Sequence, residues 1–235
     1  HPADLADGAR RGGALNLSMR VDDVDWPGLR DRIFTRIDAI SEGGKAYREG
    51  PENPNVTVYT GYGRFVGEKT LSIALHDGGE TTITGERFVI AAGGRASVPD
   101  IAGLELGPRV HTSDTIMRID ELPRSLVILG GGFIAAELGH VFSAFGSEVT
   151  QLVRGDRVLR SHDHDVAAAF AKAAAERWNL MLGTLPREVR ADADGVDVVL
   201  DGRVVRADQV LVATGRVPNS DRLDLFGLGH RLGGG

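Results

Sequence analysis

The chain contains no cysteine among its 235 residues. This absence excludes a disulfide-stabilised scaffold, thiolate metal sites, and any thiol or disulfide chemistry carried out by these residues alone. The length does not require cross-links, because a chain of this size forms one or two domains that bury a hydrophobic core.

Blocks of one charge and long apolar runs are also absent. The 27 basic and 33 acidic residues give a net charge of −6 and are interspersed, which argues against a nucleic-acid footprint or a polybasic membrane anchor. No apolar run approaches the roughly 18 residues of a membrane-spanning helix, and the first residues lack the apolar core of a signal peptide. We therefore expect an acidic globular protein of the cytosol.

Motifs of hydrolases, zinc proteases and P-loop enzymes are missing as well. One segment, Ser-His-Asp-His-Asp at 161–165, raises the alternative of a metal site, because imidazole and carboxylate groups bind zinc and iron. The seven histidines provide no second cluster to complete such a site. We expect instead that Ser161 or Asp163 caps a helix and that the chain binds no metal.

Glycine, in contrast, is abundant, with 32 residues or about twice the average share. The glycines follow no three-residue period and form no low-complexity tract, so they indicate particular backbone positions. Asp77-Gly78-Gly79 is one of them, a predicted hairpin turn. It lies in a predicted small β-meander, whose apolar runs are 56–59, 71–75 and 87–92.

The rest of the chain is organised by its hydrophobic periodicity. Residues 22–48 are predicted to form an amphipathic helix that covers a sheet, with an apolar stripe of Trp26, Leu29, Ile33, Ile37 and Ile40. A turn-rich stretch ends at Pro123, and strands then alternate with helices, which predicts an α/β fold with βαβ units on a parallel sheet. The expected strands are 125–129, 148–153, 195–200 and 209–213, and the expected helices are 131–146 and 165–178.

The sharpest motif is Gly130-Gly131-Gly132-Phe133-Ile134-Ala135, a G-x-G-x-x-A sequence after an apolar strand. The first glycine permits a tight turn, the second lets a pyrophosphate approach the backbone, and the alanine lets helix and strand pack closely. The helix N-terminus adds free N–H groups and the positive end of its dipole. The motif predicts a Rossmann-like dinucleotide site, and a structural glycine turn is the alternative. The candidate contacts are Gly130, Gly132, Ile134 and Ala135.

The residue after the second strand distinguishes the two nicotinamide cofactors. A carboxylate there would bind a ribose 2′-hydroxyl, whereas arginine suits a 2′-phosphate. The sequence has Arg154, followed by Arg157 and Arg160, and no carboxylate at the strand end, and Arg154 and Arg160 are the predicted ligands. We therefore expect NADPH rather than NADH, with a solvated arginine loop as the alternative.

One pattern occurs twice. Residues 87–95 and 209–216 both end an apolar strand in alanine, a small residue, glycine and arginine. Small residues at the carboxyl end of a parallel strand let a ligand approach, so Ala92, Gly93 and Gly215 are candidate cofactor contacts. Tight packing of the strand ends is the alternative.

Several segments together resemble the flavoprotein disulfide reductases, which belong to the pyridine nucleotide-disulfide oxidoreductases. They are LVILGGGFIAAELGHVFSAFG, VTQLVRGDRVLR and VLVATGRVPN, preceded by FVIAAGGRASVP and HTSDTIMRIDELP. The resemblance implies an FAD domain with an inserted NADPH domain, followed by a dimer-interface domain. It assigns 1–122 to part of the FAD domain with its β-meander, 123–217 to a Rossmann-like NADPH domain, and 218–235 to a return segment.

The resemblance also implies roles for single residues. Phe133 would cover the nicotinamide pocket beside the flavin, and Glu137 would pair with a flavin-side lysine. Gly93, Gly94 and Gly215 would lie near FAD. Simpler interpretations stay open, because Phe133 could be a packed aromatic residue and Glu137 could be favoured by the helix dipole alone.

The family's redox motif, C-x-x-x-x-C, would lie just before His1, and its His–Glu acid/base pair would lie beyond Gly235. The resemblance therefore implies an internal fragment without catalytic residues and without the interface of a homodimer. For the whole protein it implies NADPH- and FAD-dependent reduction of a mycothione-like disulfide, in redox homeostasis. The alternatives are a glutathione-, mercuric- or lipoamide-type reductase, or a non-catalytic NADPH-binding module.

Overall fold

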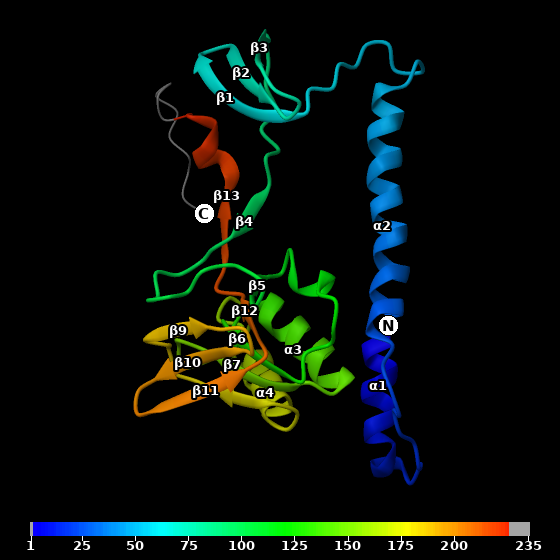
Figure 1. Ribbon diagram of the computed structural model, residues 1–235, viewed down its shortest axis with the longest axis vertical. Helices are drawn as coiled ribbons and strands as arrows, with labels where there is room; N and C mark the ends of the chain where they lie inside the picture. The colour runs from blue at the N-terminus through cyan, green and yellow to red at the C-terminus, as the bar shows by residue number, and fades with distance from the viewer. Residues whose placement is uncertain (1, 226–235) are drawn as a thin grey trace. The chain divides into compact units, whose positions relative to one another are not determined.

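The computed structural model describes residues 2–225, which divide into two compact units (Figure 1). Unit 1 comprises the residues up to 31 together with 96–215, and unit 2 comprises 32–95 and the segment that begins at 216. No helix within residues 2–225 is long and apolar enough to cross a membrane. The division into 1–122, 123–217 and 218–235 by cofactor stays a prediction, and residues 226–235 of its last part lie outside the described residues.

Unit 1 is built on a five-stranded parallel sheet with the strand order β5-β12-β6-β7-β8 (Figure 1). Its strands are β5 (Val110–Thr112), β6 (Ser125–Leu129), β7 (Glu148–Leu152), β8 (Asn179–Met181) and β12 (Gln209–Val212). α3 (Phe133–Phe145) connects β6 to β7, and α4 (His164–Ala175) connects β7 to β8. This alternation confirms the predicted α/β, Rossmann-like fold.

A separate antiparallel sheet with the order β11-β10-β9 completes unit 1. Its strands are β9 (Glu188–Ala191), β10 (Val196–Leu200) and β11 (Arg203–Ala207). The prediction that the strand near 195–200 belongs to the parallel sheet was wrong. Val196, Val198 and Leu200 are buried while the residues between them are only half-buried. This period of two is typical of a strand with one covered face.

The two faces of β6 pack against different partners. Leu126 and Ile128 belong to a cluster that includes Phe142 of α3. Val127 and Leu129 belong to a second cluster that contains the buried residues of β9 and β10. The uninterrupted apolar run of β6 is explained because both faces of this strand are covered.

The N-terminal elements of unit 1 pack on the helical side of the parallel sheet. α1 (Pro2–Arg11) contacts α3 and is followed by a 3-10 turn, η1 (Gly12–Leu15). Trp26 begins α2 (Trp26–Glu49), is buried in the cluster of Phe142, and donates its indole N–H to the Ile119 carbonyl at 2.9 Å. α2 starts four residues later than predicted, because the Asp25 carboxylate accepts from the Gly28 N–H at 2.9 Å and so caps the helix.

Two sequence expectations about unit 1 and α2 need correction. The stripe of α2 was predicted to cover a sheet, but among the described residues of this helix only Trp26 is buried, and Ile37 and Ile40 are 48% and 65% exposed. Strand β5 and the short helix η2 (Ile116–Arg118) lie in the stretch that the sequence indicates only as turn-rich.

Unit 2 contains the predicted meander, an antiparallel sheet with the order β1-β2-β3. Its strands are β1 (Gly61–Gly67), β2 (Thr70–Leu75) and β3 (Glu80–Thr84). The predicted hairpin turn is confirmed, because the Leu75 N–H donates to the Gly79 carbonyl at 3.1 Å and Gly78 and Gly79 have φ angles of 98° and 85°. The unit also contains β13 (Arg216–Pro218), which pairs with β4 (Gly94–Ala96), and η3 (Asn219–Leu223).

Two of the runs predicted as strands of the meander, 56–59 and 87–92, are not strands. Neither is paired in a β-ladder within the described residues, and Val89 is 92% exposed. β propensity alone does not form a strand, because its backbone N–H and C=O groups need a neighbouring strand to bond.

His111 of β5 gives unit 1 a testable pH dependence. Its imidazole is buried between the Thr115 hydroxyl and the Gln209 side-chain oxygen, each at 3.1 Å. Burial lowers the pKa of His111 below its ordinary value of 6.5, although hydrogen bonds to Gln209 and Pro108 partly offset this effect. The unfolded chain then binds a proton that the folded chain does not, so the contribution of His111 to stability is complete above about pH 6.5 and is lost as pH falls through its folded pKa.

We expect the free energy of unfolding to fall more for the wild-type chain than for His111→Gln when the pH is lowered from about 7.5 to about 5.5. Denaturant unfolding of both proteins at the two pH values measures this difference, and the other histidines cancel in the comparison. An equal loss in the two proteins would show that folding does not lower the pKa of His111.

Candidate dinucleotide site

The glycine turn joins β6 to α3 in the middle of the parallel sheet. Gly130 has a φ of 134°, and a Cβ there would lie 2.1 Å from the Ala213 carbonyl oxygen just after β12. A Cβ on Gly131 would lie 2.7 Å from Cγ1 of Val153. A Cβ on Gly132 would have no heavy atom within 4 Å. The fold itself therefore requires glycine at the first two positions, whereas the third has open space beside it.

The first turn of α3 has the features of a phosphate-binding site. Gly132 is its N-cap residue and no side chain caps the helix. The first N–H groups of a helix have no intrahelical carbonyl partner, and they carry the positive end of the dipole. Ala135 is fully buried, which is the close helix–strand packing that the motif predicts. The open side of Gly132 and these N–H groups fit the pyrophosphate of a dinucleotide.

Three other predicted residues lie on the first turns of α3. Phe133 is 57% exposed, and Ile134 is partly buried against the core cluster of Phe142. Glu137 is exposed and forms no ion pair within residues 2–225. Phe133 is thus not a packed aromatic residue of unit 1, and its role at a nicotinamide pocket stays a prediction, as does the pairing of Glu137 with a lysine.

The two predicted arginines lie in one loop after β7. Arg154 lies two residues after the end of this strand, Arg160 lies six residues later, and both are exposed. The loop folds back on itself, because a Cβ on Gly155 would lie 3.5 Å from Cδ of Arg160. Neither arginine forms an ion pair with a carboxylate of the described residues. Both guanidinium groups are available to an anion.

Leu159 connects this loop to the glycine turn, and the sequence alone did not single it out. Its backbone N–H donates to the Gly131 carbonyl at 2.6 Å. Its φ of 49° lies in the left-handed region, which costs a leucine roughly 1 kcal/mol or more. Because Arg160 is the next residue, the same hydrogen bond ties the arginine loop to the turn.

Gln151 and Trp178 were also missed. The Gln151 amide donates to the Gly130 carbonyl at 2.9 Å, and the Trp178 indole N–H donates to the Gln151 oxygen at 2.9 Å. The available signal was a glutamine that alternates with Val149 on one face of the strand before Arg154.

The two similar segments meet where β4 pairs with β13 (Figure 1). In unit 2, Asn219 donates to the Gly93 and Ala92 carbonyls, each at 3.0 Å. In unit 1, the Ser97 N–H donates to the Gly215 carbonyl at 2.9 Å. Gly93 and Gly215 have positive φ angles of 66° and 133°, which explains why glycine occupies both positions. Backbone conformation thus accounts for the two glycines, whereas tight packing does not, because a Cβ on Gly93 would have no heavy atom within 4 Å. The contact of Ala92, Gly93 and Gly215 with FAD stays a prediction.

Arg95, the middle residue of β4, has a structural partner. Arg95 forms a bidentate ion pair with Asp221, with N–O distances of 2.9 and 2.6 Å. The Arg95 guanidinium lowers the pKa of Asp221 below its ordinary value. In this position the arginine holds β4 to η3 and, unlike Arg154 and Arg160, is not available to a ligand.

The histidine-rich segment caps a helix. The Asp163 carboxylate accepts from the Asp165 and Val166 N–H groups at 2.9 and 3.2 Å, which confirms capping of α4 by Asp163. Residues 2–225 contain no group of three or more His, Cys, Asp or Glu side chains that could hold a metal ion.

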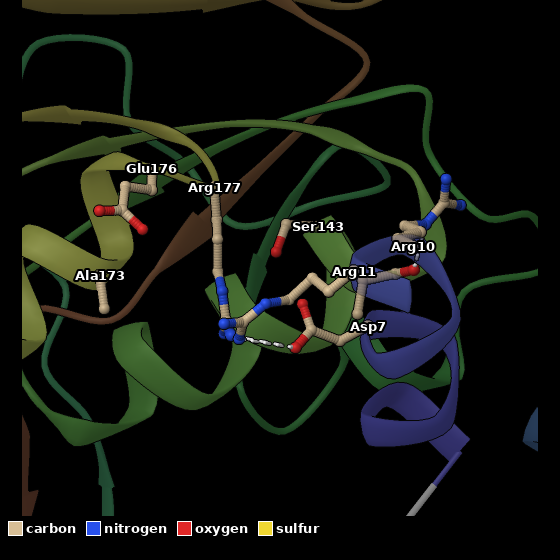
Figure 2. A pocket seen from close by; sticks show the side chains of 8 residues that line it. Asp7, Arg10, Arg11, Ser143, Ala173, Glu176 and Arg177 are labelled. Atoms are coloured by element: carbon tan, nitrogen blue, oxygen red, sulfur yellow. Dashed lines mark hydrogen bonds and ion pairs between the residues drawn. The ribbon is translucent and has the colours of Figure 1, made fainter. Parts of the chain in front are cut away.

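A pocket of about 370 Å³ lies at the opposite end of α3 from the glycine turn (Figure 2). Its lining residues are Asp7, Arg10, Arg11, Ser143, Ala144, Ala173, Glu176 and Arg177. Figure 2 shows Arg177 pointing toward Asp7, to which it donates at 3.0 Å, and Arg10 donates to the Ala144 carbonyl at 3.0 Å. The Arg10 contact holds α1 against the last turn of α3, and the Arg177 contact holds α1 to the segment just after α4. The pocket therefore lies among contacts that stabilise the fold.

The comparisons with known proteins agree with this geometry. Residues 15–234 match the sequence profile of the pyridine nucleotide-disulphide oxidoreductases. Mycothione reductase of Mycobacterium tuberculosis is 40% identical over 227 residues, which cover 95% of this chain and 49% of that protein. Dihydrolipoyl dehydrogenase of Haemophilus influenzae is 37% identical over 174 residues, which cover 72% of this chain and 36% of that protein.

A solved structure shows the same fold. The HOCl-induced flavoprotein disulfide reductase RclA from Escherichia coli aligns with a TM-score of 0.80 and 25% identity, over 99% of this chain and 50% of that one. The chain therefore belongs to the pyridine nucleotide-disulphide oxidoreductase family. Membership implies FAD and a nicotinamide nucleotide as cofactors. The chain spans about half the length of the curated relatives it matches.

The glycine turn provides a matched pair of substitutions. We expect Gly130→Ala to lower the free energy of unfolding by roughly 3 kcal/mol or more, because its Cβ would overlap the Ala213 carbonyl at a positive φ. Gly132→Ala should change stability by less than about 0.5 kcal/mol, since its Cβ has open space, but should weaken nucleotide binding. Denaturant unfolding and nucleotide titration measure the two effects. Unchanged nucleotide binding by a folded Gly132→Ala protein would place the pyrophosphate elsewhere.

Proposed function

We propose that this chain supplies the NADPH site of an FAD-dependent oxidoreductase that reduces a small-molecule thiol disulfide. One observation carries the NADPH assignment: two exposed arginines without carboxylate partners lie in the loop after β7, and that loop is hydrogen-bonded to the glycine turn. A pyrophosphate at the turn and a 2′-phosphate at Arg154 and Arg160 would be bound by adjoining parts of one surface.

The chain's own residues would bind and orient the cofactor. The N–H groups at the start of α3 would hold the pyrophosphate, and exposed Phe133 would lie at the nicotinamide end. NADPH, when bound, supplies the reducing hydride. The chain has no cysteine, so the thiols that exchange with a disulfide would come from outside these 235 residues.

The proposed substrate is a mycothione-like disulfide. Its support is the 40% identity with mycothione reductase across 95% of the chain. The glutathione-, mercuric- and lipoamide-type reductases are the alternatives, because relatives with other substrates share a third or more of their aligned residues with this chain. Cytosolic location and a homodimeric whole protein, with residues 123–217 as the NADPH domain, are part of the same proposal.

The arginine loop tests the NADPH assignment. We expect Arg154→Ala with Arg160→Ala to raise the dissociation constant of NADPH by roughly 100-fold and that of NADH by less than about threefold, because only NADPH has the 2′-phosphate. Isothermal titration of both nucleotides measures the two constants. Arg187→Ala is a control for the general effect of removing positive charge, because Arg187 lies beside the antiparallel sheet of the same unit and pairs with Asp201. Equal losses for NADPH and NADH would contradict the assignment.

The absence of cysteine allows a test of the proposal that the reacting thiols come from outside these 235 residues. We expect the 235-residue chain, supplied with FAD, NADPH and a mycothione-like disulfide, to show no disulfide-dependent NADPH oxidation, because it cannot form a mixed disulfide. Absorbance at the NADPH band measures the rate. The whole protein should reduce a mycothione-like disulfide faster than glutathione disulfide. Turnover by the cysteine-free chain would contradict the proposal, and faster reduction of glutathione disulfide by the whole protein would contradict the substrate class.

A further inference from the structure

Gln151 is a fully buried polar side chain in the parallel sheet of unit 1. It lies on β7 at 0% exposure, on the face that packs against α3. A buried amide is costly unless both of its ends are hydrogen-bonded. Both ends are satisfied here, so the partners of Gln151 show what the side chain does.

The amide of Gln151 has one possible orientation. The Trp178 indole can only donate, so the atom that faces it at 2.9 Å is the Gln151 oxygen. The Gly130 carbonyl can only accept, so the atom that faces it at 2.9 Å is the amide nitrogen. Trp178 is itself 6% exposed and packs against Gly139 of α3. The Trp178 indole, the Gln151 amide and the Gly130 carbonyl thus form a buried chain of two hydrogen bonds.

All three carbonyls of the turn are held by the protein. Gln151 binds the Gly130 oxygen, the Leu159 N–H binds the Gly131 oxygen at 2.6 Å, and the Ala136 N–H binds the Gly132 oxygen at 3.1 Å. In a trans peptide the N–H points opposite to the carbonyl. Holding a carbonyl therefore fixes the direction of the following N–H. Three successive glycines have little conformational preference of their own, so these hydrogen bonds select one arrangement.

A contribution to stability does not by itself explain why this chain of hydrogen bonds is present. An apolar pair of similar shape in place of Gln151 and Trp178 would fill the same space, and replacing both partners of a buried hydrogen bond by apolar groups is often nearly neutral. Among the three bonds to the turn, only that of Gln151 comes from a side chain, so it alone depends directly on the residue type.

We propose that Gln151 is a positioning residue for the dinucleotide. It fixes the Gly130–Gly131 peptide so that the turn presents its N–H groups to the pyrophosphate before the cofactor arrives. This inference rests on the proposed NADPH site. It adds a residue that touches no part of the cofactor and acts through the backbone of the turn.

The test is Gln151→Met, which keeps the length of the side chain and removes both hydrogen bonds. Two probes are titrated: NADPH, and adenosine 2′-phosphate, which has the 2′-phosphate but no pyrophosphate. We expect the dissociation constant of NADPH to rise roughly tenfold, and that of adenosine 2′-phosphate to change by less than about twofold. Leu152→Met is the matched control, because Leu152 is a buried neighbour on the same strand and belongs to the cluster on the other face of the sheet. It should leave both constants unchanged.

Trp178→Phe provides a second variant in case Gln151→Met does not fold. It removes the indole donor and keeps the Gln151–Gly130 bond, so NADPH binding should weaken by about threefold with adenosine 2′-phosphate again unchanged. Equal weakening of both probes in either variant would overturn the positioning role, as would unchanged NADPH binding by folded Gln151→Met. Failure of the wild-type chain to bind either probe would instead refute the NADPH site, and the positioning role with it.

Discussion

The close approach of Gly130 to the Ala213 carbonyl is the constraint on which the rest of unit 1 depends. It brings the carboxyl ends of β6 and β12 together so tightly that no side chain fits between them. The chain must therefore leave β6 through a glycine with a positive φ, and α3 starts at once on one side of the sheet. That start leaves the helix N-terminus open, and Gln151 and Leu159 then fix the turn from two directions.

The arginines of unit 1 that stabilise the fold differ from those of its candidate ligand surface in whether they are paired. Arg10 and Arg177 bind a backbone carbonyl or a carboxylate, and Arg206 bridges Asp192 and Asp197. These side chains hold elements together. The arginine loop after β7 differs, because its two predicted phosphate ligands have no such carboxylate partner within the described residues. An arginine already paired would have to give up its partner to bind a phosphate, so unpaired arginines are the better ligands.

The sequence correctly predicted the features that are determined by residues close together in the chain. The glycine turn, α3 and the hairpin at Gly78 depend on residues close together in the chain, and the apolar run of β6 reflects burial on both faces. The antiparallel strands β9 and β11 were missed because they are short and have only one covered face. The runs at 56–59 and 87–92 have strand-like composition, but a strand also needs a partner, which composition cannot reveal. Gln151 was overlooked for a related reason, since the sequence does not show that a glutamine is fully buried or what its amide faces.

The contact between α1 and α3 has a consequence for how the chain folds during synthesis. The hydrogen bond from Arg10 to the Ala144 carbonyl joins residues 134 positions apart, and unit 1 itself is interrupted by residues 32–95. At typical rates of translation, about 5–20 residues per second, α1 leaves the ribosome roughly 7–27 seconds before its docking partner exists. Ala3 and Ala6, which are buried in the folded unit, stay exposed to solvent during that interval. α1 therefore docks only after α3, which is made much later, has left the ribosome.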